Sequence, residues 1–448
     1  MDTKQTVHIA PLLDDMKIGR THIGIFILCF VTLFLDGMDF AAILVTAPAI
    51  LRDWQLEPKV MGTIFGVGNL GLLIGAVAFG KLGDIYGRRI GIVAGVLTYS
   101  LPALATAFAD SYEHLLILRF LTCIGIGGVL PNIVTLLTEG APKRVRGSSV
   151  LLASIGYALG PAAVGGLAAF LIPRTGWPSV FLIVGVAGTL LGILLYFVLP
   201  ESIRYLALKK PQSEELRQAL RRIAPDLAIG PQTQFVIDSD VSKKPGLADL
   251  FRDRLATITP LLWAVFFVET LTFMTLVSWV PILLQRSGVS PAMASLAFAY
   301  GAVGGVIAQL LLSRFIDSFG WLTTLFATIV AVAALFALGI PDLTPTLVIS
   351  LIVVAMSFAT SAHNSLYSLV GPFYPTAIRG NGVGLASGAA RVAAIIGPVV
   401  GGLLVSQLSL SGMGIAMAIP YIATAILCLV FHALRTRPAL GVSERAPA

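Results

Sequence analysis

The feature that most constrains this chain is a series of long apolar runs, each long enough to cross a lipid bilayer as a helix. A helix needs about 20 apolar residues to span the roughly 30 Å hydrocarbon core of a membrane. Strands of a membrane barrel would instead alternate apolar and polar residues over about ten positions. We therefore expect an all-α polytopic membrane protein. Twelve candidate spans lie near residues 22–50, 60–80, 90–109, 115–138, 148–171, 179–199, 257–284, 291–313, 321–340, 346–371, 381–407 and 413–434.

Composition supports this fold class and predicts an orientation. The protein is 56% hydrophobic and only 12% charged, whereas about 25% of a soluble domain is charged. The net charge of +7 does not indicate nucleic acid as a partner, because most of the 30 Lys and Arg residues fall on one side of the predicted spans. By the positive-inside rule that side is cytoplasmic and holds both termini. We expect a multi-pass protein of a bacterial inner membrane.

The sequence indicates neither a cleaved leader nor a bound metal. The first twenty residues are polar, and the apolar run after them is too long for a signal peptide. Cys29, Cys123 and Cys428 lie in apolar runs, which is typical of small buried side chains rather than of disulfides or metal ligands. The chain has no Walker A sequence, so ATP-driven transport is not indicated.

The predicted spans divide six and six around one long polar segment. The predicted parts are a cytoplasmic N-tail (1–21), a six-helix bundle (22–199), a cytoplasmic linker (200–256), a second six-helix bundle (257–434) and a cytoplasmic C-tail (435–448). The charge pattern of the linker predicts short amphipathic helices, either as a solvated connection or with a role of their own.

The two halves also repeat one another at a constant offset of 233 residues. The matches are Pro142, Arg146 and Gly147 with Pro375, Arg379 and Gly380, Asp84 with Asp317, and Asp36 with Glu269. Several matches at one offset indicate a duplicated six-helix unit. Parallel repeats of this kind place a substrate site at their interface near the bilayer midplane, so the sequence predicts a transporter.

The segment GKLGDIYGRR, residues 80–89, resembles the signature between the second and third helices of the major facilitator superfamily. The matching positions are Gly80, Leu82, Asp84, Gly87, Arg88 and Arg89, while Ile85 replaces the usual basic residue. The first-helix DGMD, the fourth-helix LRFLTCIGIGGVLPN and the late YPTAIRGNGVG and GAARVAAIIGP resemble the aromatic acid:proton symporters of that superfamily. This resemblance implies the major facilitator fold and import of a small aromatic carboxylate, such as a hydroxybenzoate, driven by protons without a cofactor.

Asp36 and Asp39 lie one helical turn apart on the same face of the first span. A charged carboxylate at the bilayer centre costs about 2.5 to 3.5 kcal/mol on insertion scales, so two of them need a reason. One interpretation is structural pairing with a buried Arg, for which Arg119 of the fourth span is the preferred partner. The other is proton coupling, because desolvation and a neighbouring acid favour the protonated form, and the resemblance implies the same role.

Two further charged residues lie within predicted spans. Glu269 is surrounded by aromatic residues, including Phe266, and is a candidate for proton coupling, structural pairing or recognition of a substrate hydroxyl. Arg391 presents a planar fork suited to a carboxylate. We expect it to bind the substrate carboxylate, with an internal counter-ion role as the alternative.

His363 and Asn364 are either packing residues or hydrogen-bonding partners of the substrate. Phe40, Tyr157 and Tyr367 could stack on an aromatic ring, although each alone is more typical of the core.

The signature predicts a cytoplasmic latch that closes in one conformation and breaks in another. Asp84 and Arg88 are spaced to pair within one helix, and Arg89 follows them. Glu139, Arg146 and Arg379 are expected to extend this network. In the second half Asp317 is present, but Trp321 and Leu322 replace the basic pair, so the second latch is expected to be degenerate.

The expected protein is therefore a proton-coupled importer and not an enzyme, with an aromatic carboxylate, protons and the bilayer as partners, acting as a monomer. The alternatives are a transporter of a non-aromatic organic anion, an efflux antiporter, or a receptor for aromatic acids. Three residues separate Gly160-Pro161 from Gly165-Gly166, whereas the antiporter signature has two, which argues against efflux.

Overall fold

The computed structural model describes residues 6–16, 18–223, 233–236, 247–252, 254–375 and 378–436, and almost all of this part of the chain is helical. Among these residues, eleven helices are long and apolar enough to cross a membrane, and α12 (Trp321–Ala337) is a shorter apolar helix. The eleven are α2 (Arg20–Asp53), α3 (Pro58–Tyr86), α4 (Arg88–Thr106), α5 (Tyr112–Gly140), α6 (Arg146–Thr175), α7 (Pro178–Val198), α10 (Leu255–Arg286), α11 (Pro291–Phe319), α13 (Pro345–Val370), α14 (Arg379–Gln407) and α15 (Leu410–Thr436). The predicted all-α fold with twelve spans is confirmed.

The helix ends follow local sequence signals. Pro58, Pro178 and Pro345 each stand at the first helical position, where the missing N–H costs nothing. Gly87 separates α3 from α4 with a φ of 109°, a conformation that side chains other than glycine rarely adopt. The predicted ninth span was too long, because α12 ends at Ala337 and the chain turns before Asp342, whose φ is 56°.

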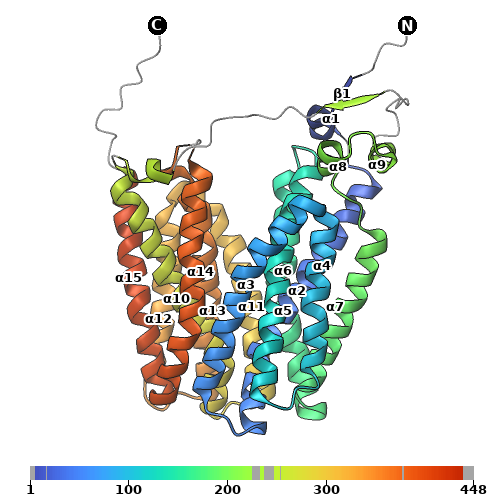
Figure 1. Ribbon diagram of the computed structural model, residues 1–448. Helices are drawn as coiled ribbons and strands as arrows, with labels where there is room; N and C mark the ends of the chain where they lie inside the picture. Colours follow the sequence, from blue (N-terminus) through green and yellow to red (C-terminus); the bar gives the residue numbers. More distant parts are fainter. Residues whose placement is uncertain are drawn as a thin grey trace, which may run out of the picture. The chain divides into compact units, whose positions relative to one another are not determined.

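The chain forms two compact units. Unit 1 comprises Met1–Lys244 with Ser278–Val303 and Pro398–Ser406, and unit 2 comprises Pro245–Val277, Gly304–Gly397 and Gln407–Ala448. In unit 1, α2 packs on α6, and α5 packs on α3 and α4; helices α2 to α7 run alongside one another in Figure 1. In unit 2, α12 packs on α13 and α15.

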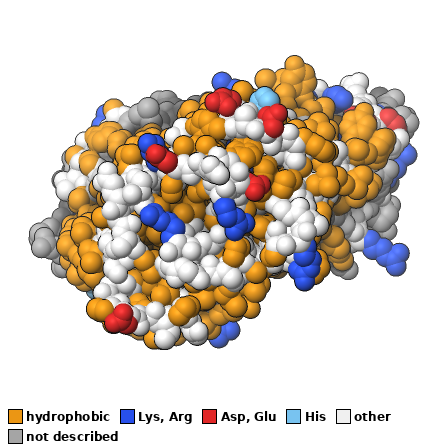
Figure 2. Space-filling view, turned by 90° about the horizontal axis from the view of Figure 1, so that it is seen from below, with side chains coloured by type: hydrophobic (Ala, Val, Ile, Leu, Met, Phe, Trp, Pro, Cys, Tyr) orange, Lys and Arg blue, Asp and Glu red, His pale blue; other side chains and the backbone are white. Residues whose placement is uncertain are grey.

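The boundary of unit 1 differs from the predicted sequence halves, because it includes the ends of α10, α11 and α14. The ring of Trp279 on α10 lies edge-on to Phe65 on α3, with centroids 5.8 Å apart, and its Nε1 donates to the carbonyl of Pro398 at 3.0 Å. Figure 2 looks onto the end of the molecule that lies away from α8 and α9, where charged side chains are scattered over a largely apolar and neutral surface.

The N-terminal segment is not only a polar tail, as the sequence suggested, but part of a small folded cap on unit 1. Strand β1 (Thr6–His8) pairs in parallel with β2 (Gln234–Val236) from the linker. Helix α1 (Ile9–Asp15) packs on the linker helices α8 (Ile203–Lys209) and α9 (Glu214–Ile223) through a cluster of buried apolar side chains. The linker also contains the short helix η1 (Leu247–Phe251), and η2 (Gly371–Phe373) follows α13. Residues 224–232 and 237–246 of the predicted linker, and most of the predicted C-tail, lie outside the described residues.

Candidate functional site

Unit 1 contains a buried cluster of two acids and one base. The side chains of Asp36 and Asp39 on α2 are fully buried, and Arg119 on α5 is 4% exposed. Arg119 Nη1 lies 3.6 Å from Asp39 Oδ1, so the predicted pairing of this arginine with a first-span acid is confirmed. The guanidinium donates its hydrogen bonds to the backbone carbonyls of Asp39 and Phe40, at 3.1 and 2.8 Å.

The carboxylates of Asp36 and Asp39 have few hydrogen bonds to compensate for their burial. None of the four carboxylate oxygens of Asp36 and Asp39 accepts a hydrogen bond from any residue that the structure describes. An unpaired buried carboxylate is very costly as an anion and is stabilised by a proton. Because the cluster holds two carboxyl groups and one guanidinium, it is neutral only when one of the acids carries a proton.

Glycines hold this cluster in place by bringing α2 and α6 into backbone contact. A Cβ added to Gly37 would lie 2.2 Å from the carbonyl oxygen of Tyr157, and one added to Gly160 would lie 2.4 Å from the amide of Met38. The close approach of α2 and α6 therefore requires glycine at both positions. The rings of Phe40 and Tyr157 lie beside the cluster, with centroids 6.4 Å apart.

Unit 2 contains a second buried acid, and it has a titratable partner. Glu269 on α10 is fully buried, and its Oε2 lies 2.6 Å from Nδ1 of His363 on α13. The other oxygen, Oε1, accepts no hydrogen bond from the described residues. His363 is therefore not only a packing residue, because it joins α13 to the buried acid of α10.

Aromatic rings surround this pair. Phe273 stacks on the His363 ring with centroids 4.5 Å apart and planes at 11°. Tyr367 lies edge-on to His363 at 5.7 Å and to the buried Phe266 at 5.2 Å. Tyr367 is 43% exposed, so this aromatic cluster has one accessible ring.

Arg391 lies near the middle of α14 and belongs to unit 2, as Tyr367 and Glu269 do. Its side chain is exposed, and among the described residues no carboxylate lies within ion-pair distance of it. A charged group at mid-span is stable only beside water or an opposite charge. The structure therefore shows no internal carboxylate partner for Arg391 among the described residues.

Asn364 does not act together with its neighbour His363. Its Nδ2 donates to Oε1 of Gln309 on α11 at 2.7 Å, and both residues line a small cavity of about 60 Å³ away from the Glu269 pair. The sequence interpretation left His363 and Asn364 as either packing residues or hydrogen-bonding partners of the substrate, and it missed Gln309, a lone amide in an apolar span.

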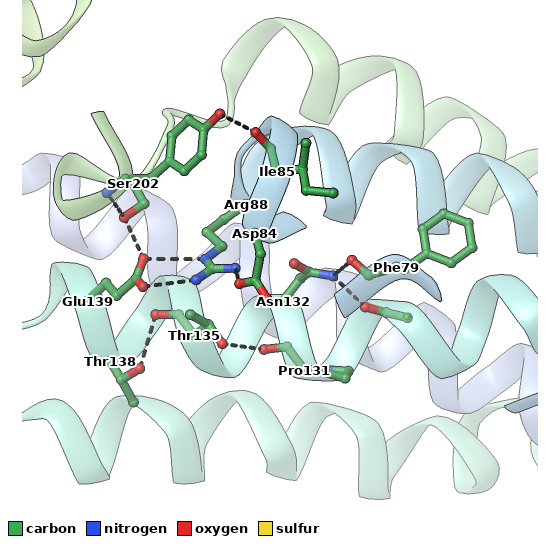
Figure 3. Close-up of polar contacts among 12 residues, drawn as sticks. Phe79, Asp84, Ile85, Arg88, Pro131, Asn132, Thr135, Thr138, Glu139 and Ser202 are labelled. Carbon is green, nitrogen blue, oxygen red and sulfur yellow. Dashed lines mark hydrogen bonds and ion pairs between the residues drawn. The ribbon is translucent and has the colours of Figure 1, made fainter. Parts of the chain in front are cut away.

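The predicted latch between α3 and α4 is present. Arg88 pairs with Asp84 in the same helical connection, and its Nη2 lies 3.2 Å from Glu139 Oε1 on α5. Figure 3 shows these three side chains together with Ser202, whose hydroxyl donates to Glu139 Oε2 at 2.6 Å. The network therefore joins the α3 to α4 turn to α5 and to the start of the linker.

Two residues of this region were missed by the sequence interpretation. Glu201 accepts hydrogen bonds from the backbone amides of Arg89 and Ser202, at 3.2 and 2.8 Å. Burial raises the pKa of the Glu201 carboxyl above its ordinary value, although those amides act in the opposite direction. Asn132, also drawn in Figure 3, donates to the carbonyls of Phe79 and Gly128, both at 2.9 Å, and fixes α5 against α3. Neither residue stands out by spacing or composition.

Other predicted members of the latch lie elsewhere. Arg146 pairs instead with Asp14 of α1 at 2.7 Å, so it anchors the N-terminal cap. Arg379 belongs to unit 2, where its Nε donates to the Tyr374 carbonyl at 3.4 Å. Asp317 is exposed at the end of α11. Gly80 has open space around it, so close packing does not explain this signature glycine.

No group of three or more potential metal ligands occurs among the residues that the structure describes. Long apolar helices with buried, incompletely paired charges are typical of a membrane transporter.

The family model of the Major Facilitator Superfamily matches residues 29–371 and 288–448. The chain is 34% identical over 431 residues to the 4-hydroxybenzoate transporter PcaK of Acinetobacter baylyi, covering 94% of each chain. It is 31% identical over 446 residues to a gallate transporter of Pseudomonas putida, covering 97% of each. The chain belongs to the major facilitator superfamily and is a multi-pass protein of the bacterial inner membrane.

A solved structure with the same fold is that of the xylose transporter XylE from Escherichia coli. It aligns with a TM-score of 0.68 at 16% identity over 92% of this chain and 98% of that chain. At this identity the likeness describes the fold alone.

Proposed function

We propose that this protein is a symporter that imports a hydroxybenzoate-like aromatic carboxylate together with protons by alternating access. The observation that carries the proposal is Arg391, an exposed mid-span guanidinium in the same unit as the aromatic cluster of Tyr367, His363 and Phe273. A guanidinium binds a carboxylate through two parallel hydrogen bonds, and the rings offer stacking surfaces for an aromatic substrate. The names of the 4-hydroxybenzoate and gallate transporters support the same substrate class.

Proton coupling follows from charge compensation. Glu269 and Arg391 are both charged groups of unit 2. Import of an anionic carboxylate together with a proton keeps the charge of this unit balanced when Arg391 binds the substrate and the Glu269 and His363 pair carries the proton. Substrate and proton then bind with mutual enhancement, as linkage between two sites requires.

The Asp36, Asp39 and Arg119 cluster supplies a second proton-binding group. Its neutral form carries one proton, because the single guanidinium compensates only one of the two carboxylates. Release of that proton leaves a net buried negative charge, which a change of helix packing must then expose to water. The two clusters therefore link protonation to conformation without any cofactor or covalent chemistry. In this proposal the transporter is a monomer, and both termini lie on the cytoplasmic side.

The test is uptake by the purified full-length protein in proteoliposomes. An imposed gradient, acidic outside, should drive accumulation of radiolabelled 4-hydroxybenzoate above the external concentration, and a protonophore should abolish it. A non-aromatic carboxylate such as succinate serves as the matched control for substrate class. Absence of accumulation across a panel of aromatic acids would refute the proposal, and accumulation driven only by the opposite gradient would indicate antiport.

A further inference from the structure

A polar cavity of about 60 Å³ lies between α11, α12 and α13 in unit 2. Seven of its ten lining residues carry a hydroxyl or an amide group, although all ten belong to apolar helices. Two of them, Ser313 and Ser368, are exposed, so the cavity is accessible from the surface of the unit. Polar groups inside a membrane are costly unless they have hydrogen-bond partners. The partners of these side chains therefore decide what the cavity can bind.

The cavity begins where α11 and α13 no longer pack directly. One turn earlier the two helices are in close contact, because a Cβ added to Gly304 would lie 2.1 Å from the hydroxyl oxygen of Ser357. At the cavity the helices are bridged by two amides instead, and Asn364 Nδ2 donates to Gln309 Oε1 at 2.7 Å. This bond leaves the Nε2 of Gln309 and the Oδ1 of Asn364 available for another partner.

Ser361 provides the clearest indication of a further partner. The hydroxyls of Ser357, Thr360 and Ser365, on the same helix, donate to backbone carbonyls of α13 at 2.7 to 2.8 Å. The Ser361 hydroxyl makes no hydrogen bond to any residue that the structure describes, although the residue is only 2% exposed. Its oxygen is nevertheless not sealed off by protein atoms, and the residue lines the cavity. The Ser361 hydroxyl therefore faces the cavity.

The walls match the hydrogen bonds of water. Gln309 Nε2 is a donor, Asn364 Oδ1 is an acceptor, and the Ser361 hydroxyl can act as either. A buried water molecule needs two to four such partners, and the cavity has room for about two molecules at roughly 30 Å³ each. None of the described lining residues is charged, so the walls do not favour an ion. Sites for small organic ligands are about 300 Å³ or larger, which excludes an aromatic acid.

We propose that this cavity binds about two ordered water molecules, which complete the hydrogen bonds of Ser361, Gln309 and Asn364 and join α11 to α13 inside the membrane. Water-mediated hydrogen bonds can form again after a small shift of the helices, whereas the backbone contact at Gly304 leaves no space for one. Helix α11 then has a fixed contact with α13 at Gly304 and an adjustable one at Gln309. This inference is independent of the transported substrate.

The first test is an experimental structure of the full-length wild-type protein at a resolution that shows ordered water. Density should appear at about 3 Å from Ser361 Oγ and from an amide of Gln309 or Asn364. The same density should be present in sodium and in potassium buffer. A cavity without density, in a map that shows other buried waters, would overturn the proposal. Density that is lost when sodium is replaced would also overturn it, because the site would then bind a cation.

The second test is the melting temperature of Ser361→Val, which fills part of the cavity with methyl groups. If water occupies the cavity, its loss leaves Gln309 and Asn364 without partners and the melting temperature falls. Filling a dry cavity would instead raise the melting temperature. Ser350→Val is the matched control for the effect of valine on the helix, because that exposed hydroxyl bonds only the Thr346 carbonyl.

A melting temperature of Ser361→Val equal to or above that of Ser350→Val would contradict bound water. Ser361→Thr keeps the hydroxyl and should melt close to the wild type, which separates loss of the hydrogen bonds from a general intolerance of substitution at this position. If Ser361→Val does not fold, the map of the wild-type protein decides the question without any variant.

Discussion

Nδ1 of His363 lies 2.6 Å from Oε2 of Glu269, so a histidine on α13 and a glutamate on α10 form one hydrogen-bonded pair inside unit 2. The pair is enclosed by Phe273 on one face and Tyr367 at its edge. This pair therefore joins α10 to α13 through one hydrogen bond between two titratable side chains.

Replacing Glu269 by Gln should separate transport from proton coupling. The amide keeps the size of the side chain and an acceptor for His363 but cannot exchange a proton. We expect gradient-driven accumulation to be lost while exchange of internal for external substrate continues, because exchange needs no net proton movement. Both rates are measured in the same proteoliposomes, and full accumulation by Glu269→Gln would remove Glu269 from the coupling mechanism.

Arg391→Lys should keep the positive charge and lose the two-pronged geometry. We expect the apparent affinity for 4-hydroxybenzoate to fall about tenfold or more, since one of two charge-assisted hydrogen bonds is lost. Titration calorimetry of the purified protein measures this change. Arg174→Lys is the matched control, because that exposed guanidinium bonds only the nearby Phe170 carbonyl and ring. If the wild type, Arg391→Lys and Arg174→Lys bind 4-hydroxybenzoate with equal affinity, Arg391 does not bind the substrate carboxylate.

Asp36→Asn and Asp39→Asn should each abolish accumulation without lowering thermal stability. The carboxylates make no hydrogen bonds to described residues, and either asparagine mimics the protonated acid of the neutral cluster, so Arg119 keeps one acid as its counter-charge. Arg119→Leu should behave differently and destabilise the protein by about 3–5 kcal/mol, because it leaves buried acids without a cation. Melting curves distinguish the two cases, and a large loss of stability in both Asn variants would indicate a structural role instead.

Gly37→Ala should disrupt the contact between α2 and α6. The added Cβ would lie 2.2 Å from the Tyr157 carbonyl, so the helices must separate. We expect a loss of about 1–3 kcal/mol or more from overpacking, measured by thermal unfolding in detergent. Gly24→Ala on the same helix is the control, since no atom lies within 4 Å of its added Cβ. Similar melting temperatures for the two variants would contradict the close approach.

Much of the fold was predictable from sequence because each span is encoded locally. The twelve apolar runs correspond to α2–α7 and α10–α15, with end points that differ by a few residues. The pairing of Asp84 with Arg88 was also predictable from their spacing of four residues, although Gly87 places Asp84 on α3 and Arg88 on α4. The N-terminal cap was not, since β1 pairs with a strand more than two hundred residues away and neither strand is longer than three residues.

The candidate site was predictable as a set of residues but not as a set of contacts. Charged residues in apolar spans are conspicuous, so Asp36, Asp39, Glu269 and Arg391 were identified directly. Their partners depend on which helix faces meet. Arg146 was expected in the latch, yet it pairs with Asp14. Ser202 of the linker instead hydrogen-bonds to Glu139 of the latch.

The amino-acid sequence by itself determined the number and order of the membrane spans, the duplication of the two bundles and the acids and bases that lie within them. These properties depend on the hydrophobicity of single segments, because each helix that crosses the bilayer must itself be long and apolar enough to do so. The tertiary structure was needed to join Glu269 to His363, Asn364 to Gln309 and Arg119 to the backbone beside Asp39. Such pairs depend on the depth and rotation at which helices pack. Close contacts such as that of Gly37 with Tyr157 set this geometry, and the periodicity of the sequence does not predict them.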